Sequence, residues 1–116
     1  MSLINIASPI SLDEKSPDIR LRELSRLILP PSAVSVSAVA AELDQLPPQI
    51  PEIAVYRHGR DLGINEGNFD YVVVADFATA DDYVVYRDHP VHQSMIQRMI
   101  AGRVAQRAAV QYTFEA

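Results

Sequence analysis

Four segments of the chain alternate apolar with polar side chains, and this period of two predicts β-strands. They span residues 19–29, about 51–59, 69–77 and 104–115. In the first segment, Leu24, Leu27 and Ile28 also fit the spacing of a helix. The pattern there favours a strand and leaves a helix open.

The strand expected at 69–77 is apolar on both faces. One face carries Phe69, Tyr71, Val73, Ala75 and Phe77. Val72 and Val74 make the opposite face apolar at its centre. In the second segment, Ile53 and Val55 are expected to share a face, with Tyr56 and His58 on the other. The last segment carries on one face Val110, Tyr112 and Phe114, and on the other Ala109, Gln111 and Thr113.

A helix is predicted between the two proline pairs of the chain. Its apolar stripe at helical spacing consists of Val36, Val39, Ala40, Leu43 and Leu46. Ser32 stands where an N-cap belongs, and the helix should end at residues 47–48, which are both proline. The glycine-containing segment 59–69 matches no phosphate-binding or dinucleotide-binding motif, so it is expected to be a flexible connection.

A second helical region follows the strand at 69–77. Thr79 is its expected N-cap, and Asp81 and Asp82 in the first turn suit the helix dipole. The region should break at His89, because a residue before proline avoids the α conformation. Pro90 then suits the first turn of a further helix, which should end at Gly102.

The order of elements is β-α-β-β-α-β, which predicts an α+β fold of the ferredoxin-like type. In it a four-stranded antiparallel sheet carries its helices on one face. The apolar Val72 and Val74 would then be exposed on the open face, a patch that soluble monomers avoid. We therefore expect a homodimer through the open sheet face, forming a dimeric α+β barrel, with room for a cavity between each sheet and its own helices.

Composition narrows the class of protein. The 116 residues suffice for one domain, assigned to 19–116, and residues 1–18 are expected to be an N-terminal extension. The formal net charge of −5 and the lack of a basic run argue against nucleic-acid binding. The chain has no cysteine, which excludes disulfides and thiolate chemistry.

Targeting signals are also lacking in the sequence. No apolar stretch approaches the roughly 20 residues that a membrane-spanning helix needs. No basic region precedes a hydrophobic segment at the start of the chain. We expect a cytoplasmic protein that contacts neither membrane nor nucleic acid and uses no cofactor.

Several motifs resemble one known family. The strand ending in Asp76-Phe77, the helix with Tyr83 and Tyr86, the segment 89–93 (His-Pro-Val-His-Gln) and the closing segment 110–112 (Val-Gln-Tyr) are similar to the stress-responsive A/B-barrel domain. The resemblance spans about residues 19–115 and implies a dimeric ferredoxin-like α+β barrel. It departs in the first strand, where members often carry a His and this chain has Glu23.

The resemblance also implies candidate site residues. In one plant polyketide cyclase of this family, which performs an intramolecular aldol condensation, the Tyr and the second His of the Tyr-x-x-His-Pro-x-His motif form the catalytic pair. They correspond to Tyr86 and His92, and the first His of the motif corresponds to His89. Most bacterial members have no established activity.

The residues themselves allow this chemistry. An imidazole such as His92 can take a proton from a carbon next to a carbonyl, and Tyr86 can donate a hydrogen bond to the resulting oxyanion. Glu23 is a candidate to orient an imidazole or bind a polar group. The alternative is a purely structural role at the helix break, which explains His89 and can also account for His92. Further ligand-binding candidates, which otherwise belong to the core, are Tyr56, Tyr71 and Tyr83.

A metal site is a weaker alternative. His89 and His92 lie three residues apart, and His58 is a candidate third ligand. No zinc-binding motif supports them, so no metal is assigned.

Two functions from different classes follow. One is a non-catalytic dimeric protein that binds a small hydrophobic ligand. The other is a cofactor-free enzyme, either cyclase- or lyase-like or monooxygenase-like, that uses Tyr86 and His92.

Overall fold

A computed structural model describes residues 19–29, 33–100 and 104–116. The elements in chain order are β1 (Ile19–Ile28), α1 (Ala33–Asp44), β2 (Ile53–Arg60), β3 (Tyr71–Phe77), α2 (Ala80–Asp88), α3 (Pro90–Ile100) and β4 (Gln106–Glu115). The expected N-terminal extension, the N-cap Ser32 and the helix end at Gly102 lie outside the described residues.

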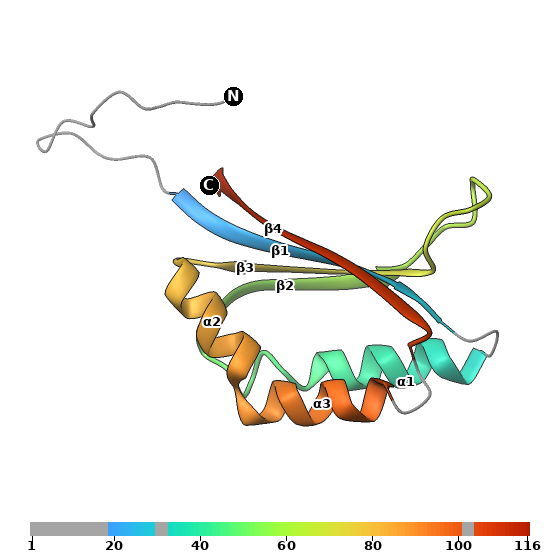
Figure 1. The fold of residues 1–116 in the computed structure, drawn as a ribbon, viewed down its shortest axis with the longest axis horizontal. Helices are drawn as coiled ribbons and strands as arrows, with labels where there is room; N and C mark the ends of the chain where they lie inside the picture. Colours follow the sequence, from blue (N-terminus) through green and yellow to red (C-terminus); the bar gives the residue numbers. More distant parts are fainter. Residues whose placement is uncertain (1–18, 30–32, 101–103) are drawn as a thin grey trace, which may run out of the picture.

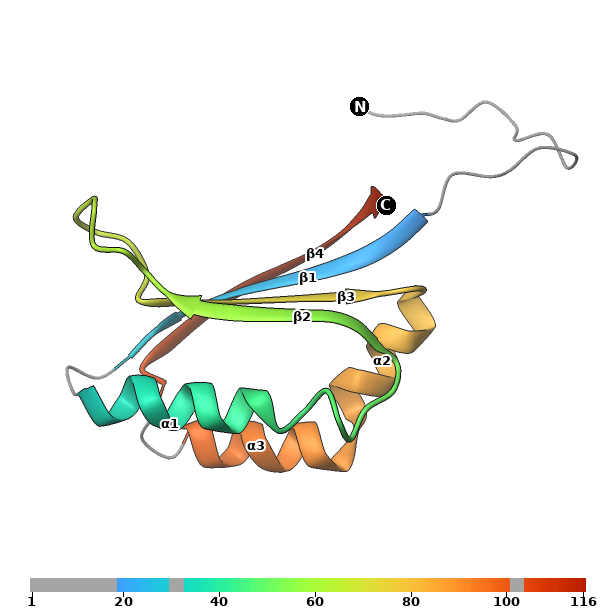
Figure 2. The same ribbon diagram turned by 180° about the vertical axis from the view of Figure 1, so that it is seen from behind.

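The strands form one antiparallel sheet in the order β2-β3-β1-β4. The helices all lie on one face of this sheet and leave the other face open (Figures 1 and 2). This is the predicted ferredoxin-like α+β fold. The first segment is a strand, as its alternation favours, and β1 occupies the centre of the sheet between β3 and β4.

The hydrophobic core lies between the sheet and the helices. Its most deeply buried side chains are Val39, Leu43, Leu46, Ile50 and Phe77. The predicted end of the first helix was wrong by a few residues, because α1 stops at Asp44. Leu46 lies in the turn that follows and is still buried, so the stripe of apolar positions continues beyond the helix.

The expected faces of β2 need one correction. Ile53 pairs with Phe77 and Val55 with Asp76, so the register shifts between them. Two steps along β2 match one step along β3, as in a β-bulge. Ile53 therefore packs against the core and does not share a face with Val55, while Tyr56 also reaches the core side.

The break between α2 and α3 forms as predicted. The Oγ1 of Thr79 accepts a hydrogen bond from the N–H of Asp82 at 3.1 Å and caps α2. His89 has an extended backbone with φ −61° and ψ 135°, and Pro90 begins α3. This corner presents Tyr86 and His92 toward the sheet, where both are buried.

The open face of the sheet combines apolar and charged groups. Val110 and Tyr112 of β4 are 54% and 43% exposed there. Arg22 forms a bidentate ion pair with Asp76, with N–O distances of 2.6 and 2.9 Å. No helix of the described segments is long and apolar enough to cross a membrane.

Candidate functional site

A cavity of about 520 Å³ lies between the helices and the sheet. Its apolar wall consists of Leu27, Leu43, Val73, Met95, Ile96, Met99 and Val104. Its polar residues come from β1, from the edge strands β2 and β4, from α2 and from the start of α3, and include Glu23, Tyr56, Tyr83, Tyr86, His92, Arg107 and Gln111. The cavity therefore offers an apolar interior next to a cluster of hydrogen-bonding groups.

His92 is held in one tautomer by the helix break. Its Nδ1 lies 2.9 Å from the carbonyl oxygen of Arg87. A carbonyl only accepts hydrogen bonds, so Nδ1 carries the proton and donates it. Burial of the ring lowers the pKa of His92, which keeps the imidazole neutral near pH 7. Its Nε2 is then a hydrogen-bond acceptor with no partner among the described residues.

Tyr86 lies directly against this imidazole. The two ring centroids are 4.1 Å apart with an interplanar angle of 31°. The hydroxyl of Tyr86 is 3.0 Å from that of Tyr56, and burial raises the pKa of both phenols. Each therefore keeps its proton. One of the two hydroxyls donates its proton to the other in this hydrogen bond. The proton of the accepting hydroxyl is then available for a hydrogen bond to another acceptor.

Glu23 supplies a buried carboxylate on the same side of the sheet. Its side chain projects from the middle of β1, and the residue is only 6% exposed. The Oε2 atom accepts hydrogen bonds from Tyr83 at 3.2 Å, from Arg107 at 3.2 Å and from Gln111 at 3.1 Å. These donors come from α2 and β4, so the carboxylate ties both elements to β1.

The sequence profile of the stress-responsive A/B-barrel domain family matches residues 30–114. The chain belongs to this family. The match begins after β1, so the strand that carries Glu23 precedes the matched part of the A/B-barrel domain. No curated protein sequence matches the chain significantly.

Solved structures of similar fold include proteins without known function and a hydroxynitrile lyase. A dimeric ferredoxin-like protein of unknown function from Thermobifida fusca is 33% identical, with a TM-score of 0.75 over 83% of this chain and 92% of that chain. A Dabb family protein from Mesorhizobium loti has 14% identity and a TM-score of 0.70, over 81% and 95% of the two chains. The hydroxynitrile lyase of Passiflora edulis has 16% identity and a TM-score of 0.74, over 86% and 96%. The last two likenesses show the fold alone.

The fold brings five of the seven expected site residues to one cavity. These are Glu23, Tyr56, Tyr83, Tyr86 and His92. His89 lies at the helix corner instead, where its Nδ1 accepts a hydrogen bond from the N–H of Val91 at 3.1 Å. That is the capping role expected for a His-Pro step.

Tyr71 is the other residue that does not line this cavity. Its hydroxyl is 2.6 Å from Nδ1 of His58, whose Nε2 is 2.7 Å from Asp44. His58 therefore links α1 to the sheet and does not meet His89 or His92. Within residues 19–29, 33–100 and 104–116, no three potential ligands cluster to hold a metal ion.

Arg107 and Gln111 were not among the expected site residues. Both lie on β4 and reach Glu23 from the neighbouring strand, where Gln111 is its direct register partner. The alternation of the last strand does place Gln111 opposite Val110 and Tyr112. What it does not reveal is that β4 pairs with β1 in the register that brings Gln111 beside Glu23.

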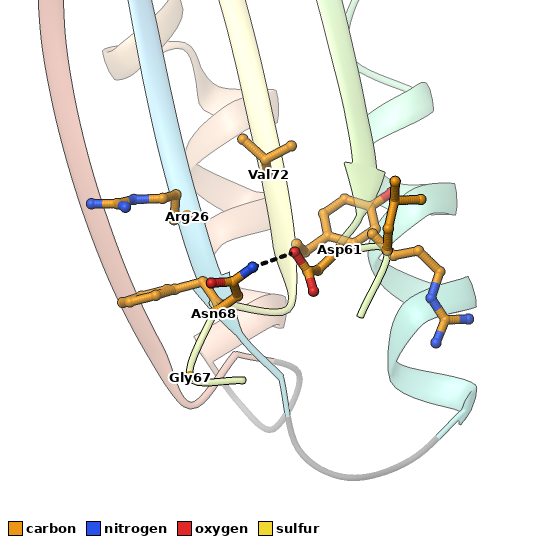
Figure 3. Close-up of a pocket in the computed structure, with 9 residues that line it drawn as sticks. Arg26, Asp61, Gly67, Asn68 and Val72 are labelled. Carbon is orange, nitrogen blue, oxygen red and sulfur yellow. Dashed lines mark hydrogen bonds between the residues drawn. The ribbon is translucent and has the colours of Figure 1, made fainter. Parts of the chain in front are cut away.

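A second hollow, of about 580 Å³, lies at the other side of the sheet, beside the loop between β2 and β3. Figure 3 shows Asn68 pointing toward Asp61, to which it donates a hydrogen bond of 3.1 Å, near Arg26 of β1. Arg26 also lies over the ring of Phe69. These contacts hold the base of the loop against the open face, and the buried histidine and carboxylate of the first cavity have no counterpart there.

The state of His92 leads to a testable prediction. Because the pKa of His92 is lower in the folded chain than its ordinary value of about 6.5, the unfolded chain binds more protons as pH falls through that value. The stabilisation from neutral His92 is thus present above about pH 6.5 and is lost below it. Denaturant unfolding at pH 7.5 and 5.5 should show a smaller pH dependence for His92→Gln than for the wild type.

Imidazole ¹⁵N shifts provide the direct check on the same residue. They should report the Nδ1–H tautomer and a pKa for His92 below that of an ordinary histidine. An Nε2–H tautomer, or a pKa above the ordinary value, would contradict the described geometry.

Proposed function

We propose that the protein binds a small, largely apolar molecule with one polar end in the cavity between sheet and helices. The observation that carries this proposal is the clustering of Glu23, Tyr86 and His92 in a cavity that also has an extended apolar wall. Ligand sites have this composition, with few polar groups that fix orientation within an apolar enclosure. Burial of a carboxylate and a neutral imidazole costs free energy unless partners compensate it, so a plain hydrophobic core would not place both groups around a cavity.

Methionine methyl groups offer a specific readout of this binding. The chain has three methionines, and Met95 and Met99 line the cavity while Met1 begins the chain. In protein labelled with ¹³C at the methionine methyls, a naphthalene-sized ligand should shift the signals of Met95 and Met99 and leave that of Met1 unchanged. The substitution Ile96→Trp should fill the cavity and weaken binding at least tenfold.

A neighbouring position supplies the control for that variant. Gln97 is exposed on the same helix and does not line the cavity, so Gln97→Trp should bind as the wild type does. If no fragment from a panel of aromatic and aliphatic alcohols, ketones and ethers shifts the Met95 and Met99 signals, the proposed function is wrong.

The binding protein is proposed to be a homodimer through the open sheet face. Val72, Val74 and Leu24 form the centre of that face, with Val110 and Tyr112 beside them. The loop between β2 and β3 projects on the same side (Figure 1) and exposes Leu62 and Ile64 by 84% and 78%. A second copy would cover both apolar regions at once. The structurally similar protein from Thermobifida fusca is described as dimeric, which supports this assembly.

The dimer is tested by placing a charge on the open face. Val110→Lys should convert a dimer into a monomer in sedimentation velocity experiments, because the lysine would be buried against the partner's apolar face without a counter-ion. Val110 is half exposed in the single chain, so the fold should survive. Thr113→Lys, on the other face of the same strand, should remain dimeric. A wild-type monomer at micromolar concentration would contradict the assembly.

A second candidate function is cofactor-free proton transfer, favoured by the state of His92. Its Nε2 is an available base, and the Tyr56–Tyr86 pair has one proton to donate toward an oxygen of the substrate. In such a site the imidazole can remove a proton from the substrate. The tyrosine hydroxyl can donate a hydrogen bond to the substrate oxygen on which negative charge develops. Among the structures of similar fold, the Passiflora edulis protein is a hydroxynitrile lyase.

Cleavage of an aromatic hydroxynitrile tests this second function. The base Nε2 of His92 would take the hydroxyl proton, the C–C bond to the nitrile would break, and an aldehyde and cyanide would form. His92→Gln should lower kcat by at least a hundredfold, since general bases contribute about 10²–10⁴-fold. His89→Asn, at the adjacent corner outside the cavity, should retain the rate. Equal rates in wild type and His92→Gln would exclude His92 as the base.

A further inference from the structure

The hydrogen bonds of Glu23 are distributed unevenly between its two oxygens. Tyr83, Arg107 and Gln111 all donate to Oε2. Within the described parts of the chain, Oε1 has no hydrogen-bond partner, although the residue is only 6% exposed and lines the cavity. A carboxylate offers about four acceptor positions, and a buried acceptor left unpaired is costly. One oxygen is thus saturated by the protein, and the other is free to meet a ligand.

We propose that Oε1 of Glu23 selects ligands that carry a hydroxyl group, so that the cavity binds neutral apolar alcohols or phenols in preference to their ethers. This inference rests on the proposed function and adds the chemical class of the ligand. A hydroxyl donates to the unpaired oxygen and satisfies it. An ether presents only lone pairs, which face the carboxylate unfavourably and leave Oε1 unpaired.

The surroundings of Glu23 favour a neutral hydroxyl over a cationic amine. Arg107 already forms an ion pair with Oε2 at 3.2 Å, so the carboxylate has a counter-ion. A second cation would lie close to that guanidinium and would have to leave water for a mostly apolar cavity. A neutral hydroxyl avoids both costs and still donates to an ionised acceptor, which is the stronger kind of hydrogen bond.

The same three donors predict the behaviour of Glu23→Gln. An amide has one acceptor oxygen and one donor NH₂ group. Since Tyr83, Arg107 and Gln111 all require an acceptor, the amide oxygen should take the place of Oε2. The NH₂ group then replaces Oε1 and presents a donor where the wild type has an acceptor. The variant should therefore lose the preference for hydroxyl ligands and accept an ether oxygen.

Matched naphthalene probes test this selection. Dissociation constants for 2-naphthol, 2-methoxynaphthalene and the cationic 2-naphthylmethylamine would be measured by the shifts of the Met95 and Met99 methyl signals. In the wild type, 2-naphthol should bind about tenfold or more tightly than its methyl ether, the effect of one hydrogen bond to a charged acceptor. In Glu23→Gln that ratio should fall to about one or reverse.

The outcomes separate this inference from the proposed function. Binding of the probes with equal affinity for naphthol and its ether in the wild type would overturn the inference alone, and so would tighter binding of the cationic amine. Absence of binding by every probe would overturn both. The wild-type comparison decides the matter even where Glu23→Gln does not fold. Where the variant folds, an unchanged preference for naphthol would show that a group other than Glu23 binds the hydroxyl, which would also overturn the inference.

Discussion

The geometry of the cavity depends on one hydrogen-bond acceptor, the carbonyl of Arg87. Because α2 stops at Asp88, this carbonyl is left without a partner in its own helix, and His92 and Gln93 from the first turn of α3 donate to it instead. The bond from Nδ1 orients the imidazole of His92 and decides which of its nitrogens is basic. Pro90 contributes by enforcing the break. The His-Pro step therefore breaks the helix and, through the hydrogen bond to Arg87, also determines which nitrogen of His92 carries the proton.

The central strand β1 shows how one alternating pattern serves two surfaces. Glu23, Ser25 and Leu27 point toward the helices and are buried there, while Arg22 and Leu24 lie on the open face. Arg22 pairs with Asp76, and its guanidinium also lies over the ring of Phe114. A shift of β1 by a single residue would bring its arginines into the cavity and the carboxylate of Glu23 to the open face, so the pairing with β3 and β4 is strongly specified.

Much of the fold could be predicted from the sequence because its signals are local. The alternation of Tyr71–Phe77, the cap at Thr79 and the break at His89-Pro90 each depend on neighbouring residues, and all are confirmed. The errors in the predicted end of the first helix and in the faces of β2 arise where contacts between distant residues determine the local structure. Leu46 is buried without belonging to a helix, and the bulge in β2 turns Ile53 toward Phe77. Neither feature has a signal in the residues beside it.

In the candidate site, too, local sequence signals identify some residues, while contacts between distant residues determine the rest. Tyr86 and His92 are found by a short motif, whereas the environment of Glu23 depends on Tyr83, Arg107 and Gln111, which are 60 to 88 positions away along the chain.

Glu23 itself is the point at which this chain departs from what its family resemblance implies. An imidazole at that position would be a poor partner for Arg107, because its one acceptor nitrogen cannot serve three donors and its protonated form would repel the guanidinium. The carboxylate of Glu23 accepts a hydrogen bond from each of the three donors through Oε2, and its Oε1 takes part in none of these bonds. The polar end of the cavity on the sheet is therefore built from Glu23 of β1 together with Arg107 and Gln111 of β4. The helix corner supplies Tyr86 and His92 to the same cavity, so the sheet and the helices each contribute polar groups to it.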